Sequence, residues 1–329
     1  MPDLAKEDLK QLVRSIVISQ GNRFIKELLR EHEIKIGTKK DDFLENLFSA
    51  IDREHLTQDM LEAWLSEVEG WGNQHIYFLE RPDIDPDNVL ELIENSEYSG
   101  LINKSDLVDF PDELELTSIQ YDADSVTFSW HKGINYRSRA QSKDYSEEID
   151  GDTYEFQAYL VRSKRTVLRF EWNFRKPYST LFIQLPNSDS NHENAISIVM
   201  ETLRELNFVE NELAKIPLST SVHGFRERPN EITSKANRLH AEGGYADLVT
   251  QLPEGGIESV EAIRNLARAV GREDFPNADG KFRLSNKVHE DLSCPLTLEI
   301  IGRESRVRIW VQCKRRDVYL LNDLIWEHC

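Results

Sequence analysis

RTVLRFEWNF, residues 165–174, decides the fold class, because its side chains alternate between two kinds of surface. Its even-numbered positions are apolar apart from Thr166, whereas Arg169, Glu171 and Asn173 are polar. A repeat of two residues is that of a β-strand, and one apolar face opposite a polar face is typical of an antiparallel sheet. The sequence therefore predicts a central antiparallel sheet. We expect its neighbouring strands at 125–130, 154–161 and 178–185.

A helix is predicted to cover this sheet. The apolar residues after the last strand recur at three- and four-residue spacing, which is the period of one helix face. These residues are Ile196, Val199, Met200, Leu203 and Leu206. Strands followed by a covering helix make an α+β domain, which we place at residues 116–210.

The chain before this domain divides into two parts. Residues 1–80 have the helical period over most of their length and are predicted to form a helical bundle. Residues 81–115 are predicted to be an acidic linker with one short helix. The stretch from 80 to 115 carries twelve carboxylates against Arg81 and Lys104.

The chain after this domain is predicted to hold a second α+β domain. Residues 211–245 have irregular patterning and are expected to be a connector, and 246–329 form the C-terminal domain. Within that domain we expect a helix over 257–270 and a β-hairpin. The hairpin pairs 296–301 with 306–313, around a turn that contains a glycine.

The net charge is unevenly distributed. The 329 residues carry 59 acidic and 40 basic side chains, a formal charge of −19. Residues 1–120 account for −15 of this and residues 121–329 for only −4. The acidity therefore does not exclude local basic surfaces that attract nucleic acid.

The expected compartment is the cytoplasm. No apolar run approaches the roughly 20 residues that span a bilayer, so we expect no membrane association. No signal peptide is visible at the start of the sequence. Cys294, Cys313 and Cys329 are an odd and sparse set, which fits a reducing environment. They lack the paired spacing of zinc ligands, so no metal site is predicted from them.

The second strand of the predicted C-terminal hairpin is the best candidate for a binding surface. Basic and aromatic side chains alternate there with an apolar face of Val307, Ile309 and Val311. Guanidinium groups around an indole on a sheet surface suit phosphates and a stacked base. Alternatively, the arginines pair with Glu299 and Glu304 across the hairpin. The candidate nucleic-acid-binding residues are Arg306, Arg308, Trp310, Lys314, Arg315 and Arg316.

RFIKELLREHEIKIGTKKDDFLENL, residues 23–47, has a leucine-rich helix, a short extended segment, a glycine and a lysine pair before a second helix. Over residues 23–51 it resembles the SAP motif, a small helix–extended–helix unit. The resemblance implies contact with duplex DNA, with Lys35, Lys39 and Lys40 matching the phosphate-binding part of the motif. The alternative is a structural or protein-binding bundle.

The run WVQCKR, residues 310–315, also resembles the Gln-x-Lys half of the PD-(D/E)xK nuclease family. The resemblance implies that Gln312 and Lys314 share one face of a strand, with Asp291 and Glu299 as candidate upstream acids. In that family the acids hold a divalent metal and the lysine helps to activate water. Mg²⁺ is needed only under this alternative, and otherwise no cofactor is expected.

The sequence contains no complete catalytic signature: it lacks a nucleophile elbow, a Walker A lysine and a dinucleotide fingerprint. We therefore expect a non-catalytic recognition or adaptor protein that associates with nucleic acid and has a protein partner. Two alternatives stay open. One is a protein-interaction module of a larger assembly, and the other is the metal-dependent nuclease.

Overall fold

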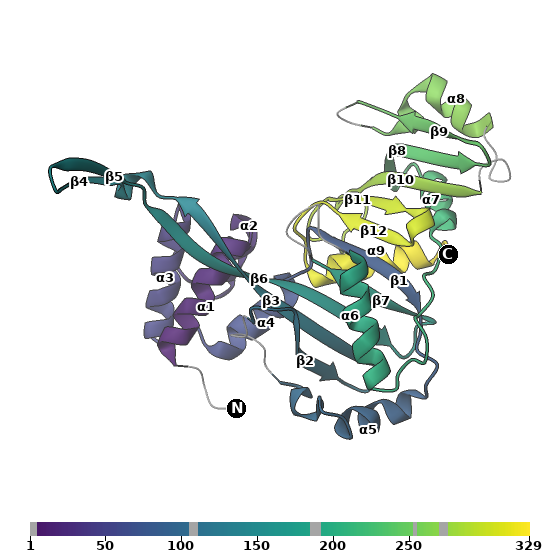
Figure 1. Cartoon of the computed structure of the whole chain (residues 1–329). Helices are drawn as coiled ribbons and strands as arrows, with labels where there is room; N and C mark the ends of the chain where they lie inside the picture. The colour runs from purple at the N-terminus through teal and green to yellow at the C-terminus, as the bar shows by residue number, and fades with distance from the viewer. Residues whose placement is uncertain (1–4, 105–110, 185–191, 253–254, 270–275) are drawn as a thin grey trace. The chain divides into compact units, whose positions relative to one another are not determined.

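A computed structural model describes residues 5–104, 111–184, 192–252, 255–269 and 276–329. The chain forms two compact units, which we describe separately (Figure 1). Unit 1 comprises residues 1–64, 106–116 and 131–166, and unit 2 comprises 65–105, 117–130 and 167–329.

N-terminal helices dominate unit 1, as predicted. They are α1 (Lys6–Ser19), α2 (Asn22–Glu31), α3 (Lys40–Asp52) and α4 (Gln58–Val68), the last of which ends in unit 2. Their periodic apolar residues form the interior, and Val13, Leu28 and Phe43 are buried. The Asp42 carboxylate stabilises the start of α3, because it accepts the backbone N–H groups of Thr38 and Lys39. These hydrogen bonds lower the pKa of Asp42.

A two-stranded arm also belongs to unit 1. Strands β4 (Tyr145–Ile149) and β5 (Asp152–Phe156) pair in register as a hairpin. In the sequence the arm follows β3 (Ser125–Arg139) and precedes β6 (Tyr159–Asn173). Each of these long strands has residues in both units.

A ten-stranded antiparallel sheet dominates the fold, in the order β2-β3-β6-β7-β1-β12-β11-β10-β8-β9. It contains β3 and β6 and eight further strands. These are β1 (Gln74–Glu80), β2 (Glu115–Tyr121), β7 (Tyr178–Ile183), β8 (Ile232–Ala241), β9 (Gly244–Val249), β10 (Asn277–Leu284), β11 (Leu296–Ile301) and β12 (Arg306–Ile309).

The main core of unit 2 lies on one face of this sheet. Helices α7 (Ser219–Arg226) and α9 (Arg315–Trp326) pack there against inward residues such as Ile76, Val307 and Phe282. On the opposite face, α6 (His192–Glu205) covers one end of the part that the structure describes. This helix starts beside β1, where the rings of His192 and His75 lie 4.3 Å apart.

The α+β class, the N-terminal helices and the antiparallel sheet agree with the sequence prediction. The predicted hairpin exists as β11 and β12, although β12 ends at Ile309. The expected linker holds α5 (Val89–Glu94) between the short helices η1 (Pro86–Asn88) and η2 (Ser99–Leu101). The helix expected over 257–270 is η4 (Ile257–Ser259) followed by α8 (Glu261–Ala269).

Other features differ from the sequence prediction. Residues 211–245, expected to be irregular, contain α7 and β8. Strand β1, at the end of the expected bundle, is a central strand of the sheet. The strands of the predicted central and C-terminal domains therefore share one sheet, because β1 joins β7 to β12.

The polar face of residues 165–174 is also covered, contrary to the predicted half-buried strand. Tyr319 of α9 donates a hydrogen bond to Glu171 (2.6 Å), and the Arg169 guanidinium lies 4.7 Å from the centre of the Trp71 ring. Burial raises the pKa of Glu171. Among the described residues no helix is both long and apolar enough to cross a membrane.

Candidate functional site on the open face of the sheet

Directly paired residues of antiparallel strands point to the same face, so the strand register identifies the side chains that share a surface. Arg308 of β12 pairs with His75 of β1 on one side and with Glu299 of β11 on the other. Glu299 in turn pairs with Lys281 of β10. These four polar side chains form one row across the sheet.

A second row runs parallel to the first. Tyr77 pairs with Arg306, and beyond Ile301 the row continues through β10, β8 and β9. Its further members are Asp279, Arg238 and Asp247. Both rows lie opposite the core that α7 and α9 cover. We call the part of this face on β8–β12 the open face.

Trp310, immediately after β12, is the main aromatic group beside the first row. Its side chain is 40% exposed, although its backbone N–H donates to the Thr297 carbonyl. The guanidinium carbon of Arg308 lies 3.5 Å from the ring centre, and the Lys281 ammonium lies 5.3 Å from it. Each such cation–π contact contributes about 0.5–1 kcal/mol at an exposed site.

Arg308 and Lys281 differ from Arg306 in whether they form an ion pair. Arg306 forms a 2.6 Å ion pair with Glu304, so the alternative reading of paired arginines holds at that residue. Arg308 and Lys281 form no ion pair with any residue that the structure describes, although Glu299 lies between them in the row. They therefore keep N–H donors for an external anion.

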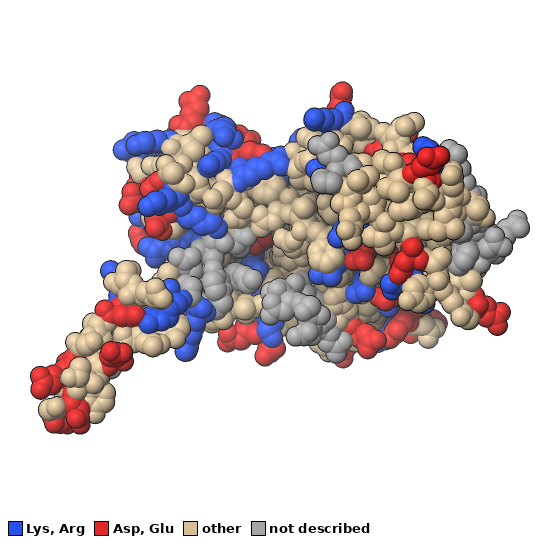
Figure 2. All heavy atoms as spheres, turned by 90° about the horizontal axis from the view of Figure 1, so that it is seen from above, with Lys and Arg blue, Asp and Glu red and all other residues tan. Residues whose placement is uncertain are grey.

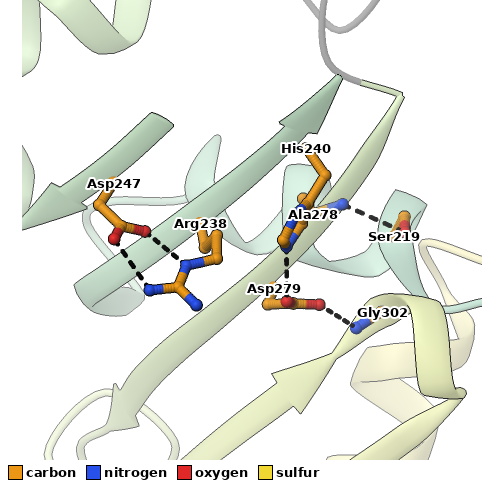
Figure 3. Close-up of polar contacts among 7 residues, drawn as sticks. All are labelled: Ser219, Arg238, His240, Asp247, Ala278, Asp279 and Gly302. Atoms are coloured by element: carbon orange, nitrogen blue, oxygen red, sulfur yellow. Dashed lines mark hydrogen bonds and ion pairs between the residues drawn. The ribbon is translucent and has the colours of Figure 1, made fainter. Parts of the chain in front are cut away.

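The charges at the β8–β9 end of the open face are matched within the protein (Figure 3). Arg238 donates two hydrogen bonds to Asp247, at 2.7 and 2.9 Å. His240 Nε2 lies 2.8 Å from Asp279, whose other oxygen accepts the Gly302 N–H. This end is held together by internal pairs.

Ser219, His240 and Asp279 do not form a catalytic triad. The Ser219 hydroxyl accepts the backbone N–H of Ala278, a core residue, rather than contacting His240 (Figure 3). Gly302 is required at this position, because a Cβ there would lie 2.2 Å from the Ala278 carbonyl oxygen. The contacts fix η5 (Gly302–Glu304) against β10 and serve a structural role.

The strand arrangement expected for Gln312 and Lys314 is not formed. Both residues follow the end of β12, and Lys314 is the N-cap of α9. The chain turns there because the buried Asp317 carboxylate accepts the N–H groups of Lys314 (2.8 Å) and Ser293 (2.6 Å). The Cys313 thiol also donates to the Trp71 carbonyl, which fixes the turn.

The remaining predicted residues of that segment lie apart from the open face. Arg315 donates to the Tyr319 hydroxyl (2.9 Å) on the face that α9 covers, and Arg316 is exposed in the first turn of α9. Of the candidate acids, Glu299 belongs to the first row and Asp291 is exposed in the loop before β11. No group of three or more His, Cys, Asp or Glu residues within the described ranges is placed to hold a metal ion.

The candidate lysines of unit 1 have different environments. Lys35 and Lys39 are exposed before α3. Lys40 instead donates to the carbonyls of Val17 (2.7 Å) and Gln20 (3.3 Å) at the end of α1. Its ammonium is therefore engaged within the protein, and Lys35 and Lys39 are the accessible members of the SAP-like set.

Sequence reasoning missed several members of the site. Lys281 lies on β10, which was not predicted, and His75 and Tyr77 lie on β1, within the residues that were expected to form the helical bundle. The alternation of buried and open positions along ADGKFRL, residues 278–284, is the signal that identifies Lys281 and Arg283. The pairing of β1 with β12 has no local signal.

Comparison with protein-family models and with curated proteins gave no match to this chain.

Proposed function

We propose that the chain is a nucleic-acid-binding recognition protein, and that its open face binds a single strand. The observation that carries this proposal is the group of Trp310, Arg308 and Lys281, in which two cations without ion-pair partners among the described residues flank an exposed indole. A base stacks on the exposed part of Trp310, and the adjacent phosphates contact the two cations.

A single strand fits this group better than a duplex. Aromatic stacking needs an unpaired base, and a flat sheet surface presents the indole to a base that is splayed out of its own stack. The stacked base contributes about 1–3 kcal/mol. Duplex contact is the expectation from the SAP-like segment, where Lys35 and Lys39 would supply it, and it is a separate activity of unit 1.

The experiment is an equilibrium binding measurement by fluorescence anisotropy. Short single-stranded DNA and RNA and the corresponding duplex are titrated with the full chain at low and moderate salt, without and with Mg²⁺. We expect single strands to bind and Arg308→Gln to weaken that binding. Absence of single-strand binding at low salt overturns the proposal, and strand cleavage dependent on Mg²⁺ would favour the nuclease alternative.

A second candidate function rests on the β4–β5 arm. Large apolar side chains are exposed along the arm and its base, and Tyr145 stacks on Phe156 with ring centres 4.8 Å apart. Exposed apolar groups in this density mark a protein-interaction site. The exposed residues are Tyr145, Ile149, Tyr154, Phe156, Tyr159, Leu160 and Val161.

The charge of the arm indicates the kind of partner. Residues 145–161 carry five carboxylates and no lysine or arginine. Figure 2 shows these acidic side chains gathered at the tip of the arm, at the lower left. Such a surface repels nucleic acid, so we propose that it binds a protein with basic side chains around an apolar patch.

The arm is tested by quantitative affinity capture with wild-type protein and with Tyr154→Ser/Phe156→Ser. A protein captured only by the wild type is then purified, and its direct binding is measured at two salt concentrations. We expect binding that weakens with salt and is lost in the double variant. If the wild type and the double variant capture every protein equally, the proposal that the arm binds a protein partner is wrong.

A further inference from the structure

We propose that His75, His192, Tyr77, Arg306 and Lys215 form a binding site for a phosphomonoester, the terminal phosphate of a strand on the open face. This inference rests on the proposed function, because it assigns one end of the strand to these residues. We call them the terminal-phosphate site.

The site gathers on β1, β12, α6 and the segment after α6. The Tyr77 hydroxyl lies 2.8 Å from His192 Nδ1, and the Lys215 ammonium lies 5.2 Å from the centre of the Tyr77 ring. The ring of His75 contacts that of His192 edge-on. Arg306 is the direct strand partner of Tyr77.

Two polar atoms of the site are buried without a hydrogen-bond partner in the described structure: Arg306 Nε and His75 Nδ1. A buried donor without a partner costs about 1–3 kcal/mol, so such atoms in a folded protein require an explanation. Arg306 pairs with Glu304 through an outer guanidinium nitrogen and also forms a hydrogen bond with the Tyr77 hydroxyl. Its Nε–H has no partner among the described residues and is left for another acceptor.

The chemistry of the groups selects the ligand. When the Tyr77 hydroxyl donates to Nδ1 of His192, the proton of that imidazole lies on Nε2, which becomes a further donor. The site therefore presents guanidinium, ammonium and imidazole N–H groups together. An oxyanion with several acceptor oxygens satisfies such a set.

The electrostatics of the site favour an added anion. Arg306 and Arg308 on β12 and Lys215 face the two histidines, against the carboxylates of Glu304 in η5 and Glu193 in α6. Burial, the His192 ring and the two arginines lower the pKa of His75 to about 3. A bound anion opposes this lowering and therefore raises the pKa of both histidines.

A phosphomonoester fits better than a phosphate within a strand. It carries close to two negative charges at neutral pH and three free oxygens, whereas an internal phosphodiester carries one charge and two free oxygens. The monoester thus matches both the charge and the number of donors. Arg308 belongs to the same row as His75 and also contacts Trp310, so it links this site to the stacking position.

The experiment uses the full chain and two probes. Inorganic phosphate is titrated while the side-chain ¹H–¹⁵N signals of His75 and His192 are followed, and oligonucleotides with a 5′-phosphate, a 3′-phosphate or neither are compared by anisotropy. We expect phosphate to raise the pKa of both histidines. We also expect one phosphorylated strand to bind about tenfold more tightly than the unphosphorylated strand.

The matched variants are Arg306→Gln, in the site, and Arg303→Gln, an exposed neighbour in η5. Arg306→Gln is expected to remove the preference for the phosphorylated strand, and Arg303→Gln to retain it. Histidine signals that do not respond to phosphate overturn the site. A phosphate response combined with equal binding of all strands overturns the assignment to a strand end. A phosphate response without any strand binding leaves the site intact and overturns the proposed function instead.

Discussion

The guanidinium carbon of Arg308 lies 3.5 Å from the centre of the Trp310 ring, so the cation and the stacking surface form one unit. Cross-strand pairing sets the position of Arg308 opposite Glu299, and the turn after Ile309 sets the position of Trp310. Because Trp310 is held by its own backbone hydrogen bond to Thr297, the contact belongs to the folded sheet.

Salt dependence measures the number of phosphates that the open face neutralises. For single strands the slope of log K against log salt is about −0.7 for each phosphate contacted, so contacts by Arg308 and Lys281 give about −1.4. Lys281→Gln is expected to lower the magnitude of the slope by about 0.7. Anisotropy titrations at several salt concentrations measure it, and an unchanged slope in the variant contradicts the role of Lys281.

Stability is expected to fall in mild acid because of His75. Its pKa in the folded protein is about 3, below the ordinary value, so unfolding takes up a proton as the pH decreases from about 6.5 towards 3. The stability is therefore fully present above pH 6.5 and is lost progressively below it. After allowance for solvent screening, His75→Gln should reduce this loss by about 1 kcal/mol.

The measurement is denaturant unfolding of the wild type and His75→Gln between pH 7 and pH 4. His289→Gln is the matched control, because that histidine also has a ring nitrogen without a described partner but lies in the loop before β11. Parallel stability curves for the wild type and His75→Gln would contradict the lowered pKa.

Tyr319→Phe is expected to destabilise unit 2 by about 1–3 kcal/mol. The Tyr319 hydroxyl donates to Glu171 and accepts from Arg315, so its removal leaves a buried carboxylate without this donor. Burial already raises the pKa of Glu171, so its titration costs stability as the pH rises from the ordinary pKa of a glutamate through the raised one.

The loss in Tyr319→Phe should therefore be larger at neutral pH than below the ordinary pKa of a glutamate, where the carboxyl is protonated in both states. The double variant Glu171→Gln/Tyr319→Phe removes the charge and should recover part of the stability. Chemical denaturation at the two pH values tests this, and a loss independent of pH is the opposing result.

Thiol accessibility should distinguish the three cysteines. Cys294 and Cys313 are buried and Cys329 is exposed. Burial also raises the pKa of Cys313 well above its ordinary range, which keeps it protonated. Native labelling with a chromogenic disulfide should modify one thiol per chain and none in Cys329→Ser, whereas denatured protein should release three. Rapid labelling of a second native thiol would show that the α9 packing is wrong.

The sequence predicts the individual helices and strands better than it predicts which segments pack against each other. The alternation in residues 165–174 correctly indicates a strand, because that signal is local. The cover over Glu171 comes from Tyr319, 148 positions later, which no local pattern contains. The prediction that only the apolar face of a strand is buried therefore fails where a helix from a distant part of the sequence contacts the polar face.

The candidate site shows the same limit. Arg306, Arg308 and Trp310 are recognisable from alternation, and they lie together at the end of β12. Continuation of that strand to Lys314 is a reasonable local prediction, but the buried Asp317 carboxylate ends it by capping α9. Lys281 joins the site only through the register of β10 against β11, in which it pairs with Glu299.

The central claim is that an indole and its two neighbouring cations bind a single strand. Its most direct test compares Trp310→Ala with Tyr245→Ala by anisotropy on one labelled single strand. Tyr245 is also an exposed aromatic residue, 63% exposed with the Arg238 guanidinium 4.8 Å from its ring centre, but Asp247 neutralises that arginine. We predict a loss of about tenfold or more in affinity for Trp310→Ala and a change of less than about twofold for Tyr245→Ala. Equal effects of the two substitutions, or no effect of either, would contradict the claim.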